Sequence, residues 1–166
     1  MNIDFKILID ASGSMGYMKG SKEEGKYLLP DGETRTDLVK KIINTSLTDI
    51  FPLSTNLDIF TFRKSISLDK YGNKIIRVKN AIDAKGQKIR QQYHPEFNDL
   101  KPIYNGAINI SLIKDKINAI NNPDIGGTPL WWSLSVLVNK SKTKTIIIVL
   151  SDGDANDKAN FDTEIF

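Results

Sequence analysis

Short apolar runs alternate along this chain with segments whose apolar residues follow a helical period. The runs "IDFKILI" (3–9) and "KTIIIVL" (144–150) are rich in β-branched residues, which predicts buried strands. From Thr34 to Ile50 the apolar residues recur every three to four positions, and the pattern stops at Pro52. This spacing predicts an amphipathic helix of about four turns.

The remaining segments complete an alternation of strands and helices. Residues 56–68 alternate apolar and polar side chains, and 70–80 follow across a Gly-Asn turn, so the two predict a β-hairpin. Helices are predicted at 111–120 and 129–140, whereas 81–110 carry no regular pattern. Strands that alternate with helices favour an α/β fold with a Rossmann-like, mostly parallel sheet and helices on both faces.

Composition narrows the class of protein. The 166 residues fit one domain, and 40% apolar with 26% charged residues is typical of a globular chain. No apolar run approaches the roughly 18 residues of a membrane-spanning helix, and the charged N-terminus does not resemble a secretory signal. Cysteine is absent, which excludes disulfides and thiolate chemistry and favours a cytoplasmic location.

Both buried runs end in oxygen-bearing side chains. Asp10, Ser12 and Ser14 follow the first run, and Asp152 follows the last. Because the carboxyl ends of parallel strands meet at one edge of a sheet, we expect these groups to converge. Two facing carboxylates repel unless a cation lies between them, and oxygen ligands without His or Cys suit Mg²⁺ or Mn²⁺. Thr128, in a glycine-rich loop, is a third source of oxygen.

Three motifs occur in a fixed order: "DASGS" (10–14), "GGTPL" (126–130) and "SDGDAND" (151–157). Together they resemble the von Willebrand factor A (VWA) domain with its metal-ion-dependent adhesion site (MIDAS). The resemblance covers most of the chain and implies a single VWA-like domain over residues 1–166.

The resemblance also implies how the site works. Ser12, Ser14 and Thr128 would supply hydroxyl ligands to Mg²⁺ or Mn²⁺, while Asp10 and Asp152 would act mainly through metal-bound waters. An Asp or Glu carboxylate of a protein partner would complete the coordination. The implied function is therefore a binding module for adhesion or scaffolding and not an enzyme. Intracellular members of this family often work beside AAA-type ATPases or inside larger assemblies.

Simpler explanations stay open for the same residues. The residues 10–14 fit a plain turn, Thr128 fits a helix N-cap, and Asp152 fits a turn. Asp154, Asn156 and Asp157 are expected as supporting or solvated groups and not as ligands.

Two alternative functions also stay open. One is a metal-dependent phosphohydrolase that uses the two aspartates. The other is a binder of an anionic polymer through the stretch from Arg63 to Arg90, which holds nine Lys or Arg against two Asp. A solvated surface explains that stretch better than nucleic acid does.

The chain departs from the family pattern in two places. Residues 17–33 are predicted to form an inserted loop at the rim of the metal site, where it reads the partner or acts as a lid. The family also continues beyond the "SDG" strand, so the domain is expected to be C-terminally short and to lack a further strand and helix layer. Strand 144–150 is then an apolar edge, covered by a partner, by a second copy or by more of a longer protein.

Overall fold

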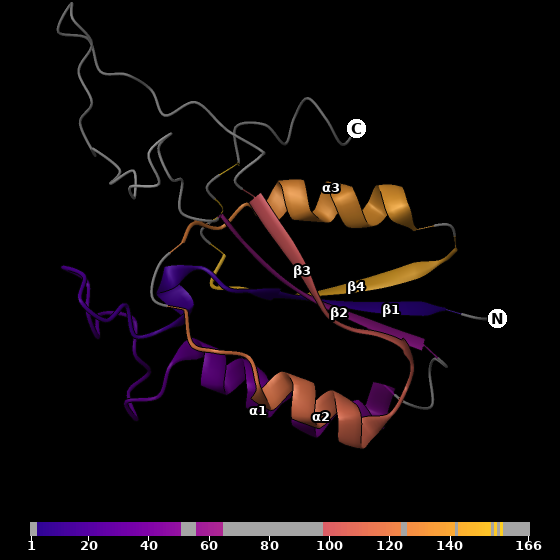
Figure 1. The fold of residues 1–166 in the computed structure, drawn as a ribbon, viewed down its shortest axis with the longest axis horizontal. Coiled ribbons are helices and arrows are strands. Elements are labelled where there is room, and N and C mark those ends of the chain that lie inside the picture. The colour runs from indigo at the N-terminus through magenta and orange to yellow at the C-terminus, as the bar shows by residue number, and fades with distance from the viewer. Residues whose placement is uncertain are drawn as a thin grey trace, which may run out of the picture.

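The computed structural model describes residues 3–50, 56–64, 98–123, 126–141, 143–153, 155 and 157. Within them, four strands form one sheet in the order β3-β2-β1-β4 (Figure 1). The strands are β1 (Asp4–Asp10), β2 (Asn56–Lys64), β3 (Asn98–Ala107) and β4 (Thr145–Leu150). β1 pairs in parallel with β2 on one side and with β4 on the other, whereas β2 and β3 are antiparallel. The predicted α/β class with a mostly parallel sheet is confirmed at this level.

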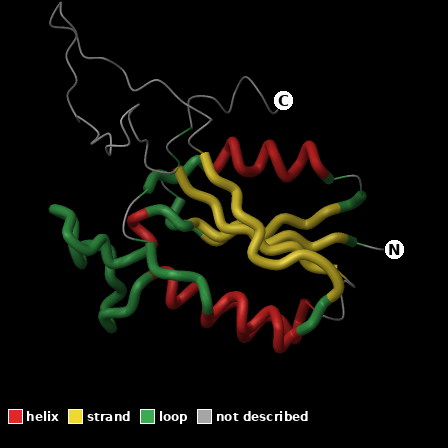
Figure 2. The backbone as a smooth tube through the Cα atoms, viewed as in Figure 1, coloured by secondary structure: helices red, strands yellow, loops and turns green. Residues whose placement is uncertain are grey.

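Helices cover both faces of the sheet (Figure 2). Helices α1 (Arg35–Ile50) and α2 (Ile110–Asn118) lie on one face, and α3 (Leu130–Lys140) lies on the other. A short 3-10 turn, η1 (Gly13–Met15), follows β1. Among the residues that the structure describes, no helix is long and apolar enough to cross a membrane.

The central strand β1 is apolar on both of its faces because both faces are covered. Ile7 and Ile9 are buried in the cluster that α1 and α2 complete, whereas Leu8 is buried with Leu137 of α3 on the other side. Successive side chains of a strand point to opposite faces, so a continuous apolar run is what such a strand needs. This packing holds the end of β1, and Asp10 with it, in the middle of the sheet edge.

Helix α1 begins with a capping box formed by Thr34 and Asp37. The Thr34 hydroxyl accepts a hydrogen bond from the backbone N–H of Asp37 (3.1 Å), and the Asp37 carboxylate accepts one from the N–H of Thr34 (3.4 Å). These bonds satisfy two backbone donors that a helix start otherwise leaves free. The cap fixes the first turn of α1 and therefore the position of Arg35.

The pairing of β2 differs from the predicted hairpin. Residues 57–62 are bonded to β1 on one edge and to β3 on the other, so both edges of this part of β2 are paired within the described residues. The antiparallel partner is β3, inside the stretch where no pattern was found. Pro102 and Gly106 interrupt the alternation there, because neither residue is favoured inside a strand.

Several sequence predictions lie outside the described residues. These are the second hairpin strand at 70–80, the basic stretch after Lys64, and the residues Asp154 and Asn156.

The strand β4 lies at the edge of the described sheet. Its one partner within the described residues is β1, and Ile146 is exposed on it. The remaining apolar residues of β4, Ile147 to Leu150, are partly buried. What covers this strand stays a prediction.

Candidate metal-binding site

The candidate site lies where the carboxyl ends of β1 and β4 meet. Ile9 pairs with Leu150, so Asp10 and Ser151 follow neighbouring positions of the two strands. The chain leaves β1 toward α1 on one face of the sheet and enters β4 from α3 on the other (Figure 1). In open α/β sheets, ligands bind in the crevice at such a reversal of strand order.

The Asp10 carboxylate joins the loops that follow these two strands. It is 1% exposed, and its Oδ1 accepts a hydrogen bond from the backbone N–H of Ser12 (2.8 Å). Its Oδ2 accepts one from the Ser151 hydroxyl (2.6 Å). Both oxygens are therefore engaged in holding other groups in place.

The electrostatics of Asp10 reflect its burial. Desolvation raises the pKa of this carboxyl above its ordinary value, and the charge of Asp152 adds to the rise. Hydrogen bonds from Ser151 and Ser12 oppose the rise without cancelling it. A positive charge nearby would therefore favour the ionised form of Asp10.

The two serines of the first loop present their hydroxyls together. The turn η1 brings the Ser12 Oγ and the Ser14 Oγ within 3.2 Å of each other. Ser12 is buried and Ser14 is half-buried. Two adjacent hydroxyl oxygens beside a carboxylate are ligands that a hard cation accepts.

The loop that carries Thr128 is fixed against the first loop by backbone contacts. The Gly126 carbonyl accepts a hydrogen bond from the N–H of Gly13 (3.2 Å), and the Gly127 carbonyl accepts one from Lys64 (2.8 Å). Gly126 has a φ of 131°, and a Cβ there would lie 3.1 Å from the Lys64 carbonyl oxygen. Glycine is therefore required for this close approach, and Thr128, two residues later in the same loop, is buried.

Asp152 is paired with a cation that the sequence did not reveal. One terminal nitrogen of the Arg35 guanidinium lies 2.5 Å from its Oδ2. Asp152 is an exposed residue, but its side chain is only 12% exposed, and that of Arg35 is 33% exposed. Arg35 also lies 5.4 Å from the ring centre of Tyr27, so it connects the loop 17–33 to the site.

Asp157 has a structural role that its motif did not indicate. Its carboxylate is buried and accepts hydrogen bonds from the backbone N–H groups of Trp131 (3.2 Å) and Trp132 (2.8 Å), in the first turn of α3. A negative charge at a helix N-terminus satisfies free donors and interacts favourably with the helix dipole. A carboxylate from the loop after β4 therefore caps the first turn of α3.

The residues fit a hard cation in their chemistry. Among the described residues, no group of three or more His, Asp or Glu side chains is placed to hold a metal. The candidate set is of another kind, with two carboxylates and several hydroxyls, all of them oxygen donors. The guanidinium already beside Asp152 shows that this place takes positive charge, and a metal would compete with it.

Neither protein-family models nor curated proteins match this chain. The resemblance to a VWA domain therefore rests on the three sequence motifs.

Proposed function

We propose that this protein is a divalent-cation-dependent binding module of the VWA type that grips an acidic residue of a protein partner. The observation that carries the proposal is the meeting of three loops, after β1, before α3 and after β4, around Asp10. Mg²⁺ or Mn²⁺ would be held by Ser12, Ser14 and Thr128, with Asp10 and Asp152 in support. Such a bound cation supplies an electrophilic position that a carboxylate can occupy.

The arrangement supports binding better than catalysis. Near Asp10 the described hydroxyls and carboxylates bond to one another and to the backbone. Asp152, the other carboxylate, is neutralised by Arg35. A general base or a nucleophile needs a reactive lone pair directed at a substrate. These groups instead hold one another in place. Because the hydroxyls are neutral, a metal bound by them would keep a net positive charge that a partner's carboxylate could balance.

Arg35 gives the proposed site a resident competitor. A divalent cation that draws on Asp152 has to displace the guanidinium or share the carboxylate with it. Because the Arg35 guanidinium also lies over the Tyr27 ring, such a displacement would change the contact between Arg35 and the loop 17–33. The proposed role of that loop at the rim of the site thus has a physical connection to the metal.

Thermal unfolding with millimolar Mg²⁺ or Mn²⁺, compared with excess EDTA, tests the metal. A cation that binds only the folded chain stabilises it by about 2.7 kcal/mol at 100 times its Kd, or roughly 5–10 °C in Tm for a chain of this size. Asp152→Asn should lose the shift, because it removes a carboxylate of the site. Asp115→Asn, an exposed position on α2, is the matched control and should keep it. No shift in the wild type contradicts the proposal.

A further inference from the structure

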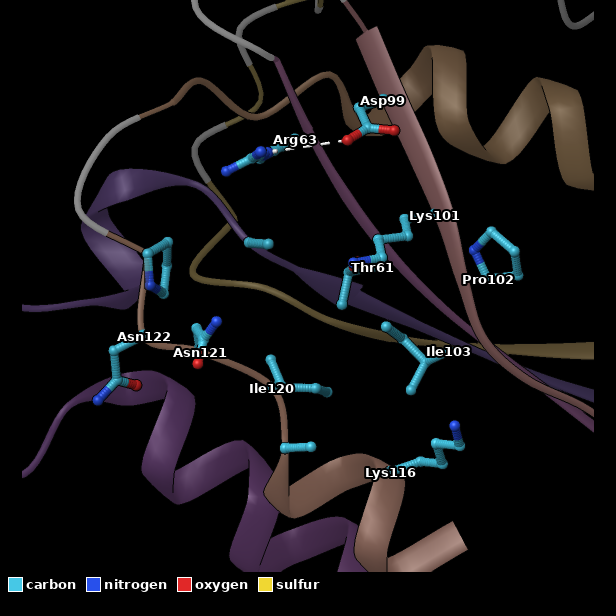
Figure 3. A pocket seen from close by; sticks show the side chains of 13 residues that line it. Thr61, Arg63, Asp99, Lys101, Pro102, Ile103, Lys116, Ile120, Asn121 and Asn122 are labelled. Carbon is cyan, nitrogen blue, oxygen red and sulfur yellow. Dashed lines mark ion pairs between the residues drawn. The ribbon is translucent and has the colours of Figure 1, made fainter. Parts of the chain in front are cut away.

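A groove of about 570 Å³ opens beside the candidate metal site. One wall is the sheet, with Thr61 and Lys101, and the other is the chain after α2, with Ile120 and Asn121 (Figure 3). Ala11, which stands between Asp10 and Ser12 in the chain, also lines it. The groove volume falls within the range of about 300–1,000 Å³ that is usual for ligand sites.

The strand register explains why charged groups gather in this groove. Thr61 lies opposite Lys101, and Arg63 lies opposite Asp99, in the antiparallel pair of β2 and β3. Residues directly opposite each other point to the same face of a sheet, here the face that α1 and α2 cover. On this face the buried apolar residues of β2 end at Ile59, so the polar positions after it border an open space.

The groove carries a net positive charge. Arg63, Lys101 and Lys116 line it, against the one acidic lining residue, Asp99. Asp99 lies 3.9 Å from Arg63, in a loose pair whose side chains are about half exposed. Lys101 and Lys116 are exposed and line the groove from β3 and from α2. The electrostatic field in the groove therefore favours an anionic occupant.

The groove and the metal site share structural parts. A Cβ on Gly16, just after η1, would lie 1.8 Å from the carbonyl oxygen of Pro123, and Pro123 lines the groove. A Cβ on Gly126, which lies beside Ser12, would be 3.8 Å from the Arg63 Cβ. An extended chain that leaves the metal site on this side therefore enters the groove directly.

We propose that this groove binds an acidic peptide segment of the partner, whose leading carboxylate is held at the metal site and whose next acidic side chains lie against Lys101 and Lys116. The inference rests on the proposed function for its leading residue only. The described lining favours a peptide over nucleic acid. It holds no aromatic ring on which a base could stack, whereas Ile103, Ile120 and Asn121 offer aliphatic surface and an amide.

Fluorescence anisotropy with two labelled octapeptides tests the groove. One peptide carries a single Asp among Gly and Ser, and the other carries that Asp followed by three Glu. In millimolar Mg²⁺ the wild type should bind the acidic peptide more tightly. Lys101→Gln with Lys116→Gln should weaken that binding about fivefold at low salt and leave the single-Asp peptide nearly unchanged.

The matched control replaces two exposed lysines near the other end of the sheet, Lys140→Gln with Lys144→Gln, and should bind like the wild type. Equal weakening by the two double variants overturns the groove. Tighter binding of a single-stranded oligonucleotide of equal charge, lost in Lys101→Gln with Lys116→Gln, also overturns it in favour of nucleic acid. If Lys101→Gln with Lys116→Gln weakens binding of the acidic peptide equally in Mg²⁺ and in EDTA, the groove is supported and the metal-held carboxylate is contradicted. Failure of the groove and failure of the proposed metal site are therefore distinguishable.

Discussion

The loops that follow β1 and β4 carry the same kinds of side chain but are held in different ways. The loop after β1 is fixed by backbone hydrogen bonds, from Ala11 to Phe62 and from Gly13 to Gly126. For the described part of the loop after β4, the contacts to other elements are made by the side chains of Ser151, Asp152 and Asp157. The first loop is thus a rigid frame, and the second supplies groups that can exchange partners.

Among variants of these two loops, removal of the Asp10 carboxylate should cause the largest loss of stability. Asp10→Ala leaves the Ser12 N–H and the Ser151 hydroxyl without their acceptor in a buried place. We expect the free energy of unfolding to fall by about 2–4 kcal/mol, measured by urea denaturation in EDTA. Asp152→Ala, where the lost partner is a half-exposed guanidinium, should cost much less. Equal losses would contradict the distinction between frame and exchangeable group.

Asp10→Asn separates the charge of this group from its hydrogen bonds. Burial raises the folded-state pKa of Asp10 above its ordinary value of 3.8, so the folded chain binds this proton more tightly than the unfolded chain does. The resulting stabilisation is complete below pH 3.8 and is lost as the pH rises through the raised pKa. In EDTA, Asp10→Asn should lack this loss. An unchanged pH profile in the variant would show that Asp10 does not cause it.

Gly126→Ala tests the backbone contact that fixes the frame. The φ of 131° and the nearby Lys64 carbonyl oxygen both oppose a Cβ at this position. We expect a loss of about 1–3 kcal/mol in unfolding free energy, together with a weaker metal-induced rise in Tm. Gly32→Ala, with a φ of 84° and no atom within 4 Å, controls for backbone strain alone. A Gly32→Ala effect on the metal response as large as that of Gly126→Ala would remove the case for this contact.

Asp157→Ala tests how firmly the second loop is anchored. It removes the carboxylate that accepts hydrogen bonds from Trp131 and Trp132, and should lower the unfolding free energy by about 1–2 kcal/mol. Chemical denaturation with the intrinsic tryptophan fluorescence as the signal would measure it. Asp157→Asn keeps one acceptor and should lose less. If Asp157→Ala leaves the free energy of unfolding unchanged, this cap contributes nothing to stability.

Arg35→Gln should have the smallest effect on stability and an opposite effect on metal affinity. The lost ion pair is partly exposed, so we expect a change of at most about 1 kcal/mol in unfolding free energy. Removal of the competing cation should tighten Mg²⁺ binding severalfold, measured by calorimetric titration. Lys40→Gln offers a control, because it removes a cation of α1 whose ion-pair partner is Asp37, three positions earlier on the same helix. Weaker Mg²⁺ binding in Arg35→Gln would assign the guanidinium a supporting role instead.

The parts of the fold that sequence predicted well are those governed by local patterns. The strands at 3–9 and 144–150 and the helix from Thr34 are confirmed as β1, β4 and α1, because an apolar run or a helical period is dictated by the face that it buries. The strand β3 was missed because Pro102 and Gly106 disturb its alternation. Its place in the sheet depends on β2 and not on its own propensity.

The contacts of the candidate site also divide into those that the sequence pattern predicts and those that it does not. The convergence of Asp10 with Ser151 follows from strand topology, which the pattern of runs already implied. The pairing of Arg35 with Asp152 joins residues 117 positions apart. The cap by Asp157 joins the loop after β4 to the first turn of α3. Such contacts depend on tertiary packing and leave no periodic signal in the chain.

The hydrogen bond between Ser151 and Asp10 has a consequence for the order of assembly. It joins residues 141 positions apart, and β1 pairs with β4 across nearly the same span. During synthesis, the central strand is made early and one of its two neighbours late, so one of its edges stays without that partner until the chain reaches residue 150. Pairings of such long range are slow to form. Protection against hydrogen exchange of those β1 amides that bond to β4 would therefore mark the moment at which the two loops of the site come together.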